Sequence, residues 1–183
     1  MNEIKLNVKN IKQKIMNIVI IGYRGTGKTS VAKMLAEKLN KNLISTDQRV
    51  VEKAKCPITE LVEKKGWSYF RQLESKVIDE IQGCHNCVID TGGGIILHKA
   101  NREKLRKHGK VILLAASIDE IRKRIVQGDS PPLTKGKTHL EELREVYEQR
   151  RKLYEESADY IIDTSHIPIE EVVKRIIRWL KEN

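Results

Sequence analysis

The sequence predicts an α/β domain built around a parallel β-sheet. Five short apolar runs alternate with longer segments of helical periodicity, which is typical of parallel strands connected by helices. The first apolar run leads directly into the glycine-rich segment Gly22–Thr29, and a helical pattern follows it. A chain of 183 residues is long enough for one domain with a core and short for two. We therefore expect a single domain over residues 17–183, preceded by an extension at 1–16.

Apolar runs and turn residues indicate where each element lies. The strands are expected at residues 17–21, 42–45, 87–90, 111–114 and 160–163. Thr46-Asp47 is expected to end the second strand. Pro57 and Gly66 should break the helical segment that follows, and Ser117 is well placed as an N-cap. The helices are expected at residues 31–39, 48–82, 98–107, 118–126, 139–156 and 168–181.

Composition and charge limit the classes of partner. The net charge of +10 suggests anionic ligands. Aromatic residues make up only 4% of the chain and the basic residues are scattered, which favours a polyphosphate ligand over a nucleic acid. No apolar run approaches the roughly 20 residues that span a bilayer, and the N-terminus lacks the apolar region of a secretion signal. We expect a cytoplasmic protein with neither a nucleic-acid nor a membrane partner.

The three cysteines, an odd number, argue against a disulfide framework and suit a reducing compartment. Cys84 and Cys87 form a C-x-x-C pattern with His85 between them, but a structural zinc site normally needs a second pair of ligands. Cys87 also begins the predicted third strand. A turn with a buried cysteine is therefore favoured over a metal site.

The segment Gly22–Thr29 fits the phosphate-binding pattern G-x-x-x-x-G-K-[ST] and lies between a strand and a helix, as its mechanism requires. Glycines let successive N–H groups point into one concavity, and the helix adds its positive N-terminal end. Lys28 can reach the β- and γ-phosphates of a nucleotide, and the Thr29 hydroxyl can ligate Mg²⁺. The residues expected to bind the nucleotide are Gly22, Gly25, Thr26, Gly27, Lys28, Thr29 and Ser30.

Further motifs follow this segment in a fixed order. They are Thr46-Asp47, Tyr69-Phe70-Arg71 with Glu74, Gly92-Gly93-Gly94, a loop at 128–137, and the segment 150–154. In this joint order the chain resembles the shikimate kinase family, over about residues 17–182. The resemblance implies a five-stranded parallel sheet in the order 2-3-1-4-5 and a lid at about 128–137. It also implies a monomer that uses ATP and Mg²⁺ to phosphorylate the 3-hydroxyl of shikimate.

The resemblance also assigns roles to single residues. Asp47 would hydrogen-bond the substrate hydroxyls and accept the reacting proton, with Lys28 as the other catalytic residue; the alternative is that Asp47 caps the next helix. Arg71 and Arg150 match two arginines that hold the substrate carboxylate, for which a planar guanidinium is suited. Arg151 could replace Arg150 after a slip of one residue.

Backbone groups and two further side chains complete the expected site. The backbone N–H groups expected to approach the substrate belong to Gly92, Gly93 and Gly94. Arg124 matches the position where the family holds an arginine over the nucleotide. Ser165, in the segment 164–168, is expected on the adenine side, where contacts are made mainly by the backbone.

The chain departs from the family pattern at the metal site. Ser45 stands where the family carries the first acid of Asp-x-Asp, so one negative charge near Mg²⁺ is missing. Asp90 ends the third strand, where many phosphate-loop enzymes hold Mg²⁺ through an acid. We hypothesise that Asp90 replaces the missing carboxylate; the alternative is that it only hydrogen-bonds a neighbouring turn.

The second departure lies in the lid. Pro131 stands where the family carries an arginine that closes over the phosphate. Lys135 or Lys137 could supply the missing charge, although lysine lacks the guanidinium fork. These departures leave two alternatives open. One is a kinase of the same fold with another acceptor, such as a sugar acid or nucleotide, and the other is a non-catalytic nucleotide-binding module.

Overall fold

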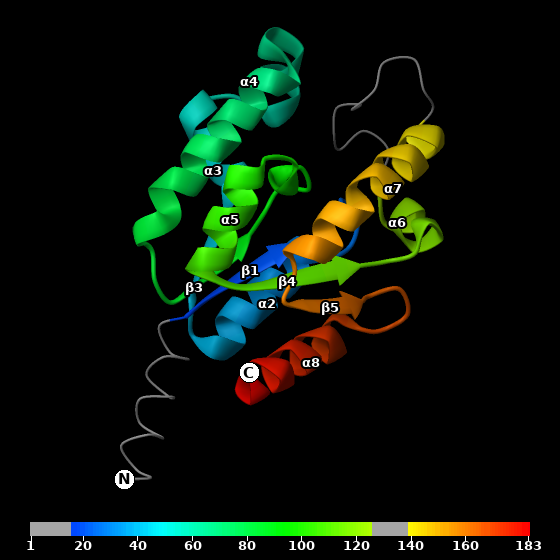
Figure 1. Cartoon of the computed structure of the whole chain (residues 1–183). Helices are drawn as coiled ribbons and strands as arrows, with labels where there is room; N and C mark the ends of the chain where they lie inside the picture. Colours follow the sequence, from blue (N-terminus) through cyan, green and yellow to red (C-terminus); the bar gives the residue numbers. More distant parts are fainter. Residues whose placement is uncertain (1–15, 126–138) are drawn as a thin grey trace.

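The computed structural model describes residues 16–125 and 139–183, and a parallel β-sheet lies at its centre (Figure 1). The strand order is β2-β3-β1-β4-β5, and every neighbouring pair is parallel. The strands are β1 (Asn17–Ile21), β2 (Asn42–Ser45), β3 (Cys87–Asp90), β4 (Gly109–Ala115) and β5 (Tyr160–Asp163). The predicted fold class and strand order are confirmed.

Helices connect the strands, as the alternating pattern predicts. They are α2 (Lys28–Leu39), α3 (Thr46–Ala54), α4 (Ile58–Glu80), α5 (Lys99–His108), α6 (Ile118–Arg124), α7 (His139–Ser157) and α8 (Ile169–Glu182), with short 3₁₀ turns η1 (Ile81–Gly83) and η2 (Ile95–Leu97). The break near Pro57 separates α3 from α4. Gly66 interrupts α4 with a φ of 78°, a left-handed conformation that suits glycine. Both predicted breaks are confirmed.

Alternate residues of β1 face opposite sides of the sheet and bury it in two apolar layers. Ile18 and Ile20 pack in a core with α2 and α8, whereas Val19 and Ile21 pack in a core with α4, α5 and α7. Figure 1 shows α2 and α8 on one side of the sheet and α4 and α5 on the other. Burial on both faces explains why β1 is a continuous apolar run instead of an alternating one.

Hydroxyl caps fix the start of two helices. The Ser117 hydroxyl accepts a hydrogen bond from the Glu120 N–H at 3.3 Å, so the predicted cap is confirmed. The Ser45 hydroxyl accepts one from the Gln48 N–H at 3.3 Å and caps α3 in the same way. The strand β2 therefore stops at Ser45, where it is predicted to stop, and Thr46-Asp47 begins α3 two residues before the predicted helix start at 48.

The turn that contains Cys84 and Cys87 is a structural connection. Cys87 is buried and begins β3, and both cysteines are free. Within residues 16–125 and 139–183, no group of three or more His, Cys, Asp or Glu side chains is arranged to hold a metal. Over the same residues, none of the helices has the length and apolar character needed to cross a membrane.

The buried side chain of Asn17 joins the starts of three strands. Its Nδ2 donates to the Cys84 carbonyl at 2.8 Å and to the His108 carbonyl at 3.3 Å, while its Oδ1 accepts from the Cys87 N–H at 2.8 Å. A Cβ at Gly109 would overlap the Asn17 carbonyl, so β4 can approach β1 this closely only because it begins with glycine. A single amide therefore satisfies the backbone at this end of the sheet.

We expect Asn17→Ala to lower the free energy of unfolding by about 1–3 kcal/mol, because it leaves a buried N–H and two carbonyls without partners. Urea unfolding measures this effect. Asn42→Ala is the matched control, since Asn42 begins the edge strand β2 with an exposed side chain, and a change within about 0.5 kcal/mol is expected there. Equal effects of the two variants would contradict this account of Asn17.

Candidate functional site

The loop between β1 and α2 forms a concavity at the carboxyl end of the central strand. Gly22, Gly25 and Gly27 have φ values of 147°, 79° and 90°, which other residues rarely adopt. Gly27 occupies the N-cap of α2 without a side-chain cap, so the first-turn N–H groups have no capping side chain. An anion is therefore favoured in this loop.

Lys28 begins α2 and turns its ammonium group back into the loop. The Nζ donates to the Tyr23 carbonyl at 2.8 Å, and the side chain is buried. Burial lowers the pKa of Lys28, while the carboxylates of Asp90 and Asp47 act in the opposite direction. A buried ammonium group near two carboxylates can bind the phosphates of a nucleotide.

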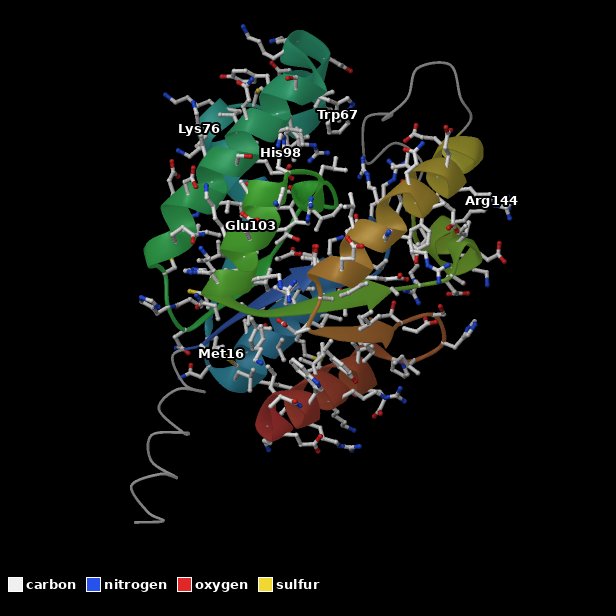
Figure 2. The ribbon with its side chains drawn as sticks, in the orientation of Figure 1. Met16, Trp67, Lys76, His98, Glu103 and Arg144 are labelled. Carbon is white, nitrogen blue, oxygen red and sulfur yellow. The ribbon has the colours of Figure 1, made fainter. Side chains whose placement is uncertain are left out.

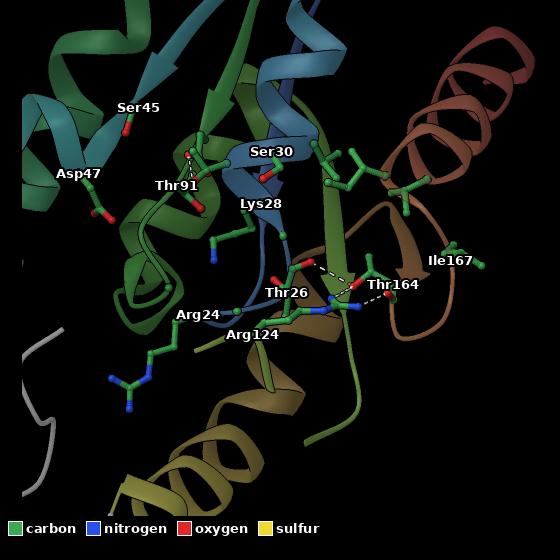
Figure 3. Close-up of a pocket in the computed structure, with 18 of the residues that line it drawn as sticks. Arg24, Thr26, Lys28, Ser30, Ser45, Asp47, Thr91, Arg124, Thr164 and Ile167 are labelled. Carbon is green, nitrogen blue, oxygen red and sulfur yellow. Dashed lines mark hydrogen bonds between the residues drawn. The ribbon is translucent and has the colours of Figure 1, made fainter. Parts of the chain in front are cut away.

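Described residues line two neighbouring cavities at this site, and the larger, with a volume of about 820 Å³, opens along this loop (Figure 3). One wall is held by Thr164, whose hydroxyl donates to the Thr26 carbonyl at 3.1 Å. Arg124 donates to the Thr164 carbonyl at 2.6 Å and to its hydroxyl at 3.1 Å. Beyond Thr164 the wall becomes apolar at Ile167 and Pro168. The cavity has the size and polarity for a nucleotide, with a cationic end and an apolar end.

Ser165 is turned away from this cavity. Its hydroxyl donates to Asp163 Oδ1 at 2.5 Å and accepts from the Ser117 N–H at 2.9 Å. Among the residues predicted for the adenine side, Thr164, Ile167 and Pro168 line the cavity. Any nucleotide contact of Ser165 would therefore involve its backbone.

Thr29 and Asp90 form a pair of oxygen donors beside the phosphate loop. The Thr29 hydroxyl donates to Asp90 Oδ2 at 2.8 Å. Asp90 Oδ1 is buried and has no hydrogen-bond partner among the described residues. Burial raises the pKa of Asp90, and the Thr29 hydrogen bond and the Lys28 charge oppose this shift. A hydroxyl and a carboxylate at this position fit the oxygen ligands that Mg²⁺ prefers.

The smaller cavity, of about 130 Å³, is lined by arginines. Arg71 is held by an ion pair with the buried Glu74 at 2.5 Å, and its guanidinium lies 5.3 Å from the centre of the Trp67 ring. Figure 2 shows Trp67 and Lys76 on opposite sides of α4, with Trp67 on the side of the cavity. Burial raises the pKa of Glu74 to about 7, although the Arg71 charge lowers it. The fixed guanidinium can bind a carboxylate.

Glycines 92–94 allow the side chains of this cavity to approach the backbone. A Cβ at Gly94 would overlap the Arg71 guanidinium, and one at Gly92 would overlap the Asp47 carboxylate. The Gly92 N–H donates to the Thr46 hydroxyl at 3.0 Å. Close approach therefore favours glycine at positions 92 and 94, whereas a Cβ at Gly93 would meet only ordinary contacts, and none of the three residues has a positive φ.

Arg150, and not Arg151, lines the smaller cavity. Arg150 donates to the Gly93 carbonyl at 3.4 Å, and the same carbonyl accepts from the buried Tyr154 hydroxyl. Arg151 is exposed and donates to Glu155 at 2.9 Å. The helical phase of α7 therefore removes the one-residue ambiguity of the sequence.

Asp47 lies where the two cavities meet and lines both of them. Its Oδ1 is buried and has no hydrogen-bond partner within the part of the chain that is described. Burial raises the pKa of Asp47, and the nearby Lys28 ammonium lowers it. Since Ser45 caps α3, the capping alternative for Asp47 is wrong. Its carboxylate can accept a proton or a hydrogen bond from a ligand in either cavity.

Two charged residues of the site, Arg24 and Glu74, had no predicted role. Arg24 lines both cavities, but it occupies a variable position of the phosphate-loop pattern, so no motif indicates a role for it. Glu74 follows Arg71 by three residues on one helix, and this spacing could have predicted their ion pair. The expected lid at 128–137, with Pro131 and both of its lysines, lies outside the described residues.

Comparisons with known proteins agree on one family. The model of the family described as shikimate kinase matches residues 24–181. A shikimate kinase of Caldanaerobacter subterraneus is 41% identical over 88% of this chain and 94% of its own, and one of Syntrophus aciditrophicus is 38% identical over 88% and 89%.

Solved structures extend this likeness to the fold. The structure of shikimate kinase from Acinetobacter baumannii in complex with shikimate has a TM-score of 0.89 and 29% identity, covering 96% of this chain and 98% of that one. A gluconokinase from Sinorhizobium meliloti, with 16% identity and a TM-score of 0.56, shares the fold alone. The two-cavity site therefore belongs to a member of the shikimate kinase family.

Proposed function

We propose that this protein transfers the γ-phosphate of ATP to the 3-hydroxyl of shikimate, giving shikimate 3-phosphate and ADP in aromatic amino acid biosynthesis. The observation that carries the proposal is the meeting of the two cavities at Asp47, one lined by a phosphate loop and the other by arginines. Family membership supports the reaction, as does the A. baumannii relative in complex with shikimate.

The larger cavity holds ATP in this proposal. The phosphates lie against the N–H groups of the phosphate loop, and Lys28 neutralises charge on the β- and γ-phosphates. Arg124 and the backbone near Ser165 lie along the nucleotide toward its adenine. Thr29 and Asp90 would hold Mg²⁺, which supplies charge neutralisation between the phosphates when it is bound. Two observations support this assignment: the Thr29–Asp90 contact of 2.8 Å, and Asp90 Oδ1, which no described residue partners.

The smaller cavity holds the acceptor. Arg71 and Arg150 bind its carboxylate, and the glycine turn at 92–94 offers backbone N–H groups. Asp47 orients the attacking hydroxyl and accepts its proton. Because burial raises the pKa of Asp47, its ionised form is a stronger base than an ordinary aspartate. Binding of both ligands thus directs the hydroxyl toward the terminal phosphate.

The proposal extends to the state of the protein in the cell. We propose a cytoplasmic monomer with neither a nucleic-acid nor a membrane partner. Three free cysteines and an aromatic content of 4% support this reading.

The test of function is ADP release with shikimate, gluconate or nucleoside monophosphates as acceptor, each with and without Mg²⁺. We expect turnover with shikimate that depends on Mg²⁺, since only an acceptor with a carboxylate and a suitably placed hydroxyl uses both arginines and Asp47. Turnover with another acceptor alone would indicate a kinase of different specificity. Binding of ATP without turnover would indicate a non-catalytic module.

Arg150→Met should raise the KM for shikimate by about 10- to 100-fold, because a hydrogen bond to a charged group is worth about 1.5–3 kcal/mol. Arg151→Met is the matched control. It removes the same charge from the neighbouring exposed position, and we expect a KM near that of the unaltered protein. Steady-state kinetics with shikimate as the varied substrate measure both. A larger effect of Arg151→Met would reverse the assignment.

Asp90→Asn should raise the Mg²⁺ concentration for half-maximal turnover by about 10- to 100-fold, as expected when a metal-site carboxylate is lost. Binding of Mn²⁺ in the presence of ADP, followed by electron paramagnetic resonance, gives a readout that needs no turnover. Asp119→Asn, an exposed change on α6, is the charge-matched control. If Asp90→Asn leaves both measurements unchanged, Asp90 does not replace the missing acid.

A further inference from the structure

Arg24 contributes a cation at the boundary between the two cavities. Among the described residues, Arg24, Asp47 and Gly93 line both cavities. In Figure 3, Arg24 and Asp47 lie on the side of Lys28 opposite to Thr164. Since the adenine is assigned to the Thr164 end, the terminal phosphate of ATP approaches Arg24 and Asp47. A guanidinium at this point faces the group that moves from one cavity to the other.

A buried carboxylate holds this guanidinium in position. Arg24 Nη2 donates to Glu142 Oε1 at 3.0 Å, and the Glu142 side chain on α7 is 0% exposed. The guanidinium also lies 5.7 Å from the centre of the Tyr23 ring. These contacts fix the orientation of the guanidinium before any ligand binds, which lowers the cost of using it in a reaction.

The guanidinium keeps donors for a ligand. Arginine has five N–H donors, and the Glu142 bond uses one of them. Arg24 Nε is buried and has no hydrogen-bond partner within residues 16–125 and 139–183. A phosphoryl group at the boundary can satisfy such donors in a planar, two-point geometry that lysine cannot offer.

We propose that Arg24 is a catalytic residue that binds the oxygens of the phosphoryl group during its transfer, an inference that rests on the proposed kinase function. In the transfer, the bond between the γ-phosphorus and the β–γ bridging oxygen breaks, and this oxygen keeps the electron pair as ADP leaves. The acceptor oxygen forms the new bond to phosphorus, and its proton passes to Asp47. Arg24 stabilises the charge on the phosphoryl oxygens in transit.

A purely structural role is the competing explanation, because the pair Arg24–Glu142 joins the phosphate loop to α7. The two roles affect different quantities. Loss of a structural contact would lower thermal stability and weaken the binding of both ligands. Loss of a catalytic cation lowers kcat and the affinity for a transition-state mimic, with little effect on the binding of substrates.

The test compares Arg24→Met, Arg24→Lys and the control Arg175→Met, which removes an exposed charge on α8. For Arg24→Met we expect kcat with shikimate to fall about 100-fold, as for other donors to transition-state charge, with KM values for ATP and shikimate changed less than about threefold. Arg24→Lys should recover part of kcat, because it keeps the charge and loses the fork. Arg175→Met should keep kcat.

A second measurement uses no acceptor. The affinity for ADP with Mg²⁺ is compared with and without aluminium fluoride, which mimics the phosphoryl group in transit. Arg24→Met should bind ADP normally and lose most of the affinity that aluminium fluoride adds. An unaltered kcat and an unaltered response to aluminium fluoride would overturn the inference, as would weakened binding of both substrates with kcat retained. If the unaltered protein does not phosphorylate shikimate but its aluminium fluoride response depends on Arg24, the proposed acceptor fails and the inference stands.

Discussion

The attraction between the buried ammonium of Lys28 and the carboxylates of Asp47 and Asp90 is the interaction on which the site depends. Burial lowers the pKa of Lys28 and raises the pKa values of both acids, and the opposite charges counteract each shift. None of the three groups could remain charged here alone at low cost. The sheet makes the cluster possible, because β3 pairs in parallel with β1 and carries Asp90 to the edge where Lys28 begins α2.

Close backbone approach is the second requirement. The Arg71 guanidinium occupies the space that a Cβ at Gly94 would need, and the Asp47 carboxylate does the same at Gly92. A side chain at either glycine would displace a charged group of the smaller cavity. The triple glycine thus brings the acceptor site close to the phosphate loop, and Gly93 lines both cavities.

The structure explains some of the departures from the family pattern and leaves others as predictions. Ser45 has a structural role, because its hydroxyl caps the N-terminus of α3. Asp90 lies against Thr29, where a replacement for the missing acid is needed, and this replacement stays a hypothesis. The hypothesis that lid lysines replace the arginine at Pro131 also stays a prediction. Arg24 offers a cation from the phosphate loop, already held by Glu142.

The sequence by itself determined the fold class, the phosphate loop, the helix breaks at Pro57 and Gly66 and most candidate site residues, because these depend on local periodicity, turn chemistry and motif order. The tertiary structure alone decided between Arg150 and Arg151, and between Ser45 and Asp47 as the cap of α3. It also revealed Arg24 at the boundary of the cavities. These questions depend on helical phase and on contacts between residues far apart in the chain, such as Arg24 and Glu142, which no local pattern encodes.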